Sequence, residues 1–453
     1  MYNDLKADLH AAADSFLEYR EGMSTSRLYK VFADLVANER LWFGAALCPG
    51  DRTDVPFVSF ERACRSEGSC IEIAEKIIGV RHDHAGRGAV LFVLAARAIL
   101  AHNKPELADH LITRWNESCG TPHNADIDRL FLRIRCRVCD SETDNIFYKL
   151  LQFKPPRLGD IVVEWVSHKW RYEGPTESLF QFLFEVMEDD RLRNKRMLAL
   201  AVALAFRLDS HWGVDAVLSA SPVAESLYDK VLPLAAYLGS HGRATQETRP
   251  FADLSESVAQ TSTYMEQLVS ERERSIAIVG NSGVELGQGK GELVDGHEEV
   301  VRFNCFSMDG KFKNDYGEKF TIHARGARND NAMHARSELA RLAVVCSYDF
   351  VNVPRDWKPF VKLSLTGARL ACLPVGFHLP IQRKLNADPS MGLAFSAYLK
   401  SVRGELPRES CFGFGFVDQI GAGAASAHYF EDARPALTHR WEKEQELFVS
   451  MLS

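Results

Sequence analysis

The chain has 453 residues, a formal charge of −7 and 46% hydrophobic residues. The length predicts two or three domains, and the composition excludes a disordered or fibrous protein. An acidic balance without a polybasic run argues against a dedicated nucleic-acid-binding protein, so no nucleic-acid partner is expected. The first residues, MYNDLKADLHAAADSFLEYR, show neither a signal-peptide layout nor an apolar span of about 20 residues, which predicts a cytoplasmic protein.

Residues 1–250 are predicted to form an all-helical domain. Apolar residues recur there at intervals of three and four, as at Leu91, Leu94, Ala95 and Ala98. Breaks such as HNKPE, FKPPRLGD and RYEGPTE separate these runs at intervals typical of helical hairpins. The pattern fits a helical bundle or a short solenoid of stacked helix pairs, although no strict repeat is present.

A second domain is predicted over residues 251–453. The polar stretch at residues 240–263 suggests a boundary near residues 245–265. Short apolar runs follow, and they predict strands at residues 276–279, 299–303, 320–324, 342–346, 369–375 and 411–416. Helical segments such as MGLAFSAYLKSV lie between several of them, so the fold class is α/β with a mainly parallel sheet.

The sequence SIAIVGNSGVELGQGKGELVDGHEEVVRFN, from Ser275 to Asn304, resembles a nucleotide-binding turn after a strand. A P-loop requires GxxxxGK followed by Ser or Thr, but Lys290 is followed by Gly291. A dinucleotide fingerprint requires GxGxxG, but the second glycine, Gly283, comes one residue late. A tight turn without a ligand would explain the glycines but not the later VDGH and VVRFN.

Four segments in order resemble the motifs of the animal-type sialyltransferases, glycosyltransferase family 29. VGNSG, DGH, RFN and DYG resemble the large sialyl motif, and DPSMG followed by an apolar helix and CFGFGF resembles the small motif. HYFE at His428 resembles the third motif, and HRWEKE from His439 to Glu444 fits the very small HxxxxE motif. The resemblance covers roughly residues 274–450. It implies a Rossmann-like, variant GT-A glycosyltransferase domain that follows the helical domain.

The resemblance also implies the reaction and the donor site. Family members transfer sialic acid from CMP-sialic acid to a sugar hydroxyl with inversion and without a metal, so no metal site and no cofactor beyond the CMP-sugar donor are expected. Backbone amides and side-chain NH or OH groups at strand ends suit the phosphate of such a donor. The implied donor-binding residues are Asn281, Ser282, Gly283, Asn304, Ser390, Met391 and Gly392. Met391 replaces a small polar residue of the family, which leaves only a backbone amide contact at that position.

Two histidines are the implied catalytic residues. His439 is the expected base for the acceptor hydroxyl, and His428 is expected to assist the departing phosphate. Thr438 is a predicted N-cap of a helix from His439 to about Met451, whose dipole would favour the neutral imidazole. Glu444, in contrast, is interpreted as part of a solvated helix face.

Three further side chains that match or lie near these motifs are given no catalytic role. His297 and His323 are expected to hold a loop or the sheet, and Glu431 is left out of the catalytic set. The lone CxxC of Cys136 and Cys139 lacks the second pair of a zinc site.

The sequence departs from the animal members in ways that affect location and substrate. Ile276 stands where they have a disulfide-bonded cysteine, and no amino-terminal anchor precedes the domain, which suggests a bacterial-type cytoplasmic enzyme. Such an enzyme would act on a glycan or glycolipid acceptor, with peripheral association at the inner membrane face. The donor sugar is sialic acid, another nonulosonic acid or Kdo. The alternative is an inactive transferase-fold scaffold with a helical partner-binding domain.

Overall fold

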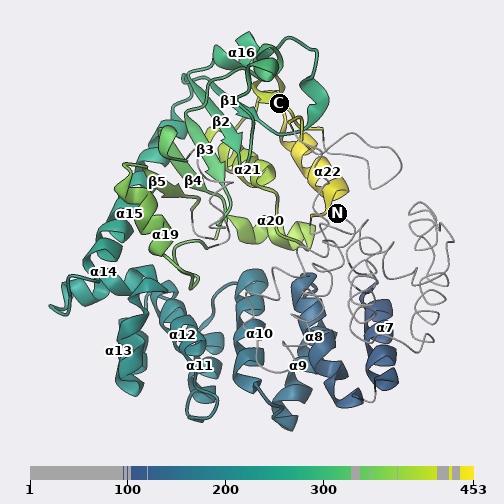
Figure 1. Cartoon of the computed structure of the whole chain (residues 1–453), viewed down its shortest axis with the longest axis vertical. Coiled ribbons are helices and arrows are strands. Elements are labelled where there is room, and N and C mark those ends of the chain that lie inside the picture. Colours follow the sequence, from purple (N-terminus) through teal and green to yellow (C-terminus); the bar gives the residue numbers. More distant parts are fainter. Residues whose placement is uncertain are drawn as a thin grey trace, which may run out of the picture. The chain divides into compact units, whose positions relative to one another are not determined.

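The computed structural model describes residues 95, 99, 104–119, 121–327, 337–347, 349–374, 376–415, 428–430 and 439–453 (Figure 1). Most of the predicted helical region before residue 104 therefore lies outside the described residues. The chain divides into two compact units, and the division falls after Pro155.

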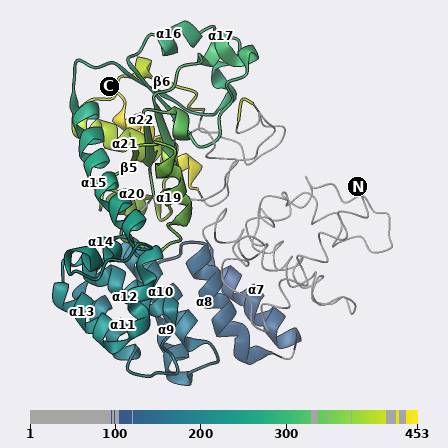
Figure 2. The same cartoon turned by 60° about the vertical axis from the view of Figure 1, so that its left-hand side comes forward.

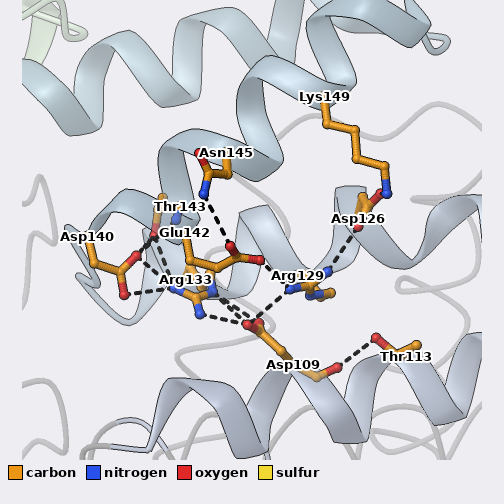
Figure 3. A network of polar contacts seen from close by, with 10 residues as sticks. All are labelled: Asp109, Thr113, Asp126, Arg129, Arg133, Asp140, Glu142, Thr143, Asn145 and Lys149. Carbon is orange, nitrogen blue, oxygen red and sulfur yellow. Dashed lines mark hydrogen bonds and ion pairs between the residues drawn. The ribbon is translucent and has the colours of Figure 1, made fainter.

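Within the part of the first unit that the structure describes, a buried ion-pair network joins three α-helices. They are α7 (Pro105–Ser118), α8 (Ala125–Arg135) and α9 (Ser141–Phe153). Arg133 on α8 is only 3% exposed, and its guanidinium donates to Asp109 on α7 and to Asp140, the N-cap of α9 (Figure 3). Burial alone would raise the pKa of Asp140, but hydrogen bonds from Thr143 and the charge of Arg133 lower it. The network fixes the three helices against one another.

Further helices open the second unit. They are α10 (Leu158–Glu173), α11 (Glu177–Val186), α12 (Lys195–Arg207), α13 (His211–Ala220), α14 (Leu232–Ser240) and α15 (Arg249–Ser270), with a 3-10 segment η2 at Pro222–Asp229. The predicted breaks FKPPRLGD and RYEGPTE do separate α9 from α10 and α10 from α11. Side chains of Thr176 and Asn194 cap α11 and α12 by accepting from backbone amides. The predicted helical structure before the sheet is thus confirmed for the described residues.

A parallel sheet forms the centre of the second unit. Among the described residues it has six strands, in the order β5-β4-β3-β2-β1-β6, and every pair is parallel. The strands are β1 (Ile276–Val279), β2 (Glu299–Phe303), β3 (Ile322–Arg325), β4 (Leu342–Val345), β5 (Leu370–Cys372) and β6 (Cys411–Phe412). This confirms the predicted α/β class, although β5 and β6 are shorter than the runs at residues 369–375 and 411–416.

Helices cover both faces of the sheet, as parallel strands require. The covering helices are α16 (Gly291–Asp295), α17 (Lys313–Tyr316), α19 (Lys358–Leu365), α20 (His378–Leu385), α21 (Met391–Arg403) and α22 (Trp441–Met451). Ile276 and Ile278 of β1 pack in a core with α15, α21 and α22, whereas Ala277 and Val279 face the opposite core with Tyr316.

The polar stretch at residues 240–263 contains most of a helix rather than a linker. Helix α15 lies along the edge strand β5 (Figure 2), and the Cys372 amide donates to Ser262 Oγ at 3.0 Å. One stripe of the helix, including Phe251, Leu254 and Val258, is buried against the sheet. The predicted boundary at residue 250 therefore marks a change of secondary structure inside the second compact unit.

Candidate functional site

The candidate site lies at the carboxyl ends of β1, β2 and β6. The chain runs from β1 through β2 to β5 on one side and returns with β6 on the other side of β1. In open parallel sheets, ligands bind beside such a reversal of strand order. The GNSG turn follows β1 directly and therefore starts at this position.

Gly280 permits the close approach of the turn after β1 to the segment after β6. A Cβ at Gly280 would collide with the carbonyl oxygen of Gly413, and a Cβ at Gly413 with that of Gly280. The Ser282 amide donates to Gly413 O at 3.0 Å, so the two loops stay joined beyond the sheet. Two glycines in register are what this contact requires.

Asn281 joins the loop after β1 to the end of β2. Its Nδ2 donates to Phe303 O at 3.1 Å and to Cys305 O at 2.8 Å. Both amide hydrogens are thus used, while Oδ1 is buried and has no hydrogen-bond partner among the described residues. Asn281 can therefore accept from a ligand hydroxyl or amine, but it is not arranged to donate to a phosphate.

Asn304 has the complementary arrangement. Its backbone is left-handed, with φ 47°, and its Oδ1 accepts from Gly326 N at 3.0 Å. His323 Nε2 contacts the Asn304 carbonyl at 2.9 Å and fixes it further, which is the sheet-holding role expected for this histidine. The amide hydrogens of Asn304 make no hydrogen bond with described residues, so they can donate to an anion. The pairing of β1 with β2 places the two asparagines close together.

Tyr316, from the DYG sequence, fixes the loop after β1 through its hydroxyl group. Its hydroxyl donates to Ser282 O at 2.6 Å and accepts from Glu285 N at 3.3 Å. Burial raises the pKa of Tyr316, so the hydroxyl stays protonated and donating. Glu285 adds a second tie because its carboxylate accepts from Gly413 N at 3.1 Å. The sequence motifs assigned no role to Tyr316 or Glu285.

The HYF segment contacts the same loop. Tyr429 N donates to Asn281 O at 2.8 Å, and the Tyr429 ring stacks on Tyr316 with centroids 3.9 Å apart. His428 precedes Tyr429, and its ring stacks on Phe430 at 5.0 Å. The structure thus places His428 next to Tyr429, whose amide donates to Asn281 in the loop after β1.

Ser390, Met391 and Gly392 form the start of α21. Ser390 is the N-cap, and its Oγ accepts from Leu393 N at 3.2 Å. The Met391 side chain packs against the core, so this residue can offer a ligand its backbone amide. A Cβ at Gly392 would lie 2.9 Å from the ring of Phe414, which explains the glycine. Phe414 lies between Gly413 and Gly415, and the segment they form joins the start of α21 to the Ser282 loop.

His439 lies beside the start of α21 in a polar arrangement. Its Nδ1 is 3.0 Å from Glu444 Oε1 and 3.2 Å from Asp388 O. Both partners are acceptors, so Nδ1 carries a proton and Nε2 is left as the basic nitrogen. The His439 side chain is 20% exposed, whereas Glu444 is fully buried.

The direction in which the surroundings were expected to shift the pKa of His439 was wrong. Burial, the largest influence, would lower the pKa of His439, but the hydrogen bond and charge of Glu444, with Asp388, raise it. Helix α22 begins at Trp441 with Arg440 as N-cap, so the predicted cap at Thr438, outside the described residues, is also wrong. A nearby carboxylate outweighs the helix dipole that was expected to favour neutral imidazole.

The interpretation of Glu444 as a solvated residue was wrong too. Its two carboxylate oxygens accept from Ser390 N at 3.1 and 3.2 Å, and it bridges His439 and the small motif. The spacing of the HxxxxE motif is the sequence signal that could have identified it. Glu431 and residues 432–438 lie outside the described residues.

The remaining site predictions concern metal binding, cysteines and a membrane span. Within the described ranges, no group of three or more His, Cys, Asp or Glu side chains is placed to hold a metal ion. Cys136 is buried at the end of α8, and Cys411 is a free thiol. None of the helices that the structure describes combines the length and apolarity needed to span a bilayer.

Comparisons with known proteins agree with the motifs. Residues 224–364 match the model of glycosyltransferase family 29 (sialyltransferase), a span that begins in η2 and contains α14, α15 and β1 to β4. "Sialyltransferase-like protein 2" of Oryza sativa subsp. indica is 38% identical over 82 residues, which are 17% of this chain. The chain spans 20% of the length of that curated relative, and no solved structure matches. The family match contains Asn281, Ser282, Gly283 and Asn304, so this part of the chain is similar to glycosyltransferase family 29 (sialyltransferase).

Proposed function

We propose that this protein is an inverting glycosyltransferase that moves an acid sugar from its CMP donor to a glycan hydroxyl. The observation that carries the proposal is the His439–Glu444 pair, because it leaves a basic Nε2 beside the start of α21. The donor sugar is sialic acid or a related acid such as another nonulosonic acid or Kdo. The acceptor is a glycan or glycolipid hydroxyl.

The donor would bind across the loops after β1 and β2. Asn304 donates to the phosphate, and the backbone amides of Met391 and Gly392 at the start of α21 add donors at the positive end of a helix dipole. Asn281 accepts from a ribose hydroxyl or the cytosine amine through Oδ1, which leaves a buried acceptor satisfied. The motifs alone imply only that both asparagines bind the donor, so this division of roles rests on the hydrogen bonds of the two side chains.

The transfer step needs one base and one stabilised leaving group. His439 Nε2 takes the proton of the acceptor hydroxyl while that oxygen attacks the anomeric carbon from the face opposite the phosphate. The bond from the anomeric carbon to the phosphate oxygen breaks, and its electrons leave with CMP. His428 donates a hydrogen bond or a proton to the departing phosphate. Glu444 stabilises the imidazolium that forms on His439.

The test combines binding and turnover. Purified protein is titrated with CMP by calorimetry and assayed for CMP release and sugar transfer with CMP-sialic acid and CMP-Kdo. We expect CMP binding in the unmodified protein and in His439→Ala, and transfer only in the unmodified protein. Removal of a positioned base should lower kcat by about 100-fold or more.

Two outcomes contradict different parts of the proposal. Binding of CMP with equal inertness of both proteins toward every donor would favour an inactive scaffold. Absence of CMP binding would overturn the assignment of Asn281 and Asn304 to the donor site.

A further inference from the structure

Asp388 links helix α10 to the His439 imidazole. Arg171 Nη1 on α10 donates to Asp388 Oδ2 at 2.5 Å, and Gln382 Nε2 donates to Oδ1 at 2.7 Å. The carbonyl oxygen of the same residue accepts from His439 Nδ1 at 3.2 Å. Asp388 is thus held on both carboxylate oxygens, and its main chain contacts the expected base two residues before Ser390.

Other contacts fix the end of α10 that carries Arg171. The buried Trp170 donates through Nε1 to Asp349 Oδ2 at 3.0 Å, in the loop after β4. Arg383 on α20 donates to Tyr172 O and to Glu173 O, both at 2.9 Å. An ion pair as exposed as Arg171 and Asp388 adds little stability by itself. Here, however, the end of α10 that carries Arg171 is fixed by these contacts, so Arg171 can hold the Asp388 carboxylate in one position.

We propose that Arg171 is a positioning residue of the transfer reaction: through Asp388 it orients the His439 imidazole without touching the substrate. The helical segment before the sheet would then form part of the catalytic machinery. The effect on rate rests on the proposed function, whereas the physical link from Arg171 to His439 does not.

The charges around His439 predict the direction in which the pKa of His439 changes when Arg171 is replaced. Glu444 of α22 and Asp388 of the loop before α21 face the imidazole, and Arg171 and Gln382 face the Asp388 carboxylate. His378 of α20 also lies in this group, but burial lowers its pKa to about 4, so it is neutral near pH 7. Arg171 therefore offsets the negative charge of Asp388, and its loss should raise the pKa of His439.

The first test is an NMR titration of the full chain with labelled histidine, in which the His439 signal is assigned with His439→Gln. Arg171→Gln is expected to raise the pKa of His439 by about 0.3–1 unit, and Asp388→Asn is expected to lower it. In the Asp388→Asn background, Arg171→Gln should shift the pKa less than half as far. The matched control is Arg196→Gln, because Arg196 pairs with Glu164 of the same helix α10.

The second test measures turnover. Arg171→Gln is expected to lower kcat by about 10-fold while the Kd for CMP stays within about twofold, because a misplaced base slows chemistry more than binding. Arg171→Lys retains the charge and should keep both the kcat and the pKa of His439 near those of the unmodified protein. Thermal unfolding checks that each variant is folded. If Arg171→Gln does not fold, Arg171→Lys and Asp388→Asn are used for the test instead.

The proposal is overturned if Arg171→Gln changes neither the pKa of His439 nor kcat beyond the range of Arg196→Gln. An equal pKa shift with and without the Asp388 carboxylate would also overturn it, because Arg171 would then not act through Asp388. Absence of transfer by the unmodified protein counts against the proposed function alone, since the titration tests the link without turnover.

Discussion

The Glu444 carboxylate joins the two parts of the candidate site that lie furthest from the opening motif. It is fully buried and contacts both His439 Nδ1 and the Ser390 amide. A buried carboxylate is retained at little cost only when its oxygens are satisfied by donors. One residue therefore sets the tautomer of the expected base and the conformation at the start of α21.

Glu444→Gln should lower the pKa of His439, because the negative charge that favours the imidazolium is lost. The acid limb of the kcat–pH profile, where His439 must lose its proton to act as base, should move to lower pH. Histidine NMR titration measures the same shift directly. Glu442→Gln, on the exposed face of α22, is the matched control and should leave both midpoints in place.

The raised pKa of His439 also affects stability. Protonated His439 stabilises the folded state below the unfolded pKa of about 6.5, and this contribution is lost as the pH rises through the folded pKa. The free energy of unfolding should therefore fall over that window in the unmodified protein and fall less in Glu444→Gln. An equal fall in both proteins would contradict the pairing.

Helix α15 shows how an element with few apolar residues completes the sheet. Its buried stripe covers the edge strand β5, and Ser262 Oγ accepts from the Cys372 amide. Edge strands expose backbone donors that must be satisfied or covered. The helix therefore belongs structurally with the α/β region, in agreement with the family match from residue 224.

Ser262→Ala should destabilise the protein by about 1–3 kcal/mol, because the Cys372 amide would lose its acceptor in a partly buried position. Thr263→Ala on the exposed side of α15 removes a hydroxyl of the same kind and should change stability by about 0.5 kcal/mol or less. Denaturant unfolding with both variants measures the difference. Equal changes in stability in the two variants would mean that the hydrogen bond from the Cys372 amide to Ser262 does not stabilise the edge of β5.

The strands could be predicted from the sequence, but several helix contacts could not. Short apolar runs mark β1 and β2 because both faces of a parallel sheet are buried. In α15 and α22 only one stripe of side chains faces the core. Because Glu444 has charged neighbours on the exposed side of α22, the sequence did not reveal that it is buried. The pairing of β6 with β1 joins residues more than 130 positions apart, and no local pattern encodes it.

At the scale of the molecule, the second compact unit begins at Pro156, well before the predicted boundary at residue 250. Leu232 and Ala235 of α14 pack in one core with Trp357 and Leu370 of the α/β region. Helix α10 contributes Trp170 and Arg171 to the loops at the carboxyl edge of the sheet. Helices α10 to α14 are thus packed as part of the same body as the sheet.

A fragment of residues 251–453 should therefore fail to fold, because it would expose the core residues that α14 covers. A fragment of residues 156–453 should fold and show a cooperative thermal transition. Near-ultraviolet circular dichroism and limited proteolysis of both fragments measure the difference. Independent folding of the shorter fragment would support the predicted boundary at residue 250.

The sequence by itself determined the α/β class, the strand positions and the similarity to glycosyltransferase family 29, because apolar periodicity and fixed motif spacing are local properties. Tertiary structure alone decided that Glu444 is buried against His439, that the pKa of His439 is raised and that Arg171 reaches the site through Asp388. The physical reason is that burial and charge pairing arise between residues distant in the chain. The same His439 that a helix dipole would keep neutral is instead controlled by a carboxylate across the first turn of α22.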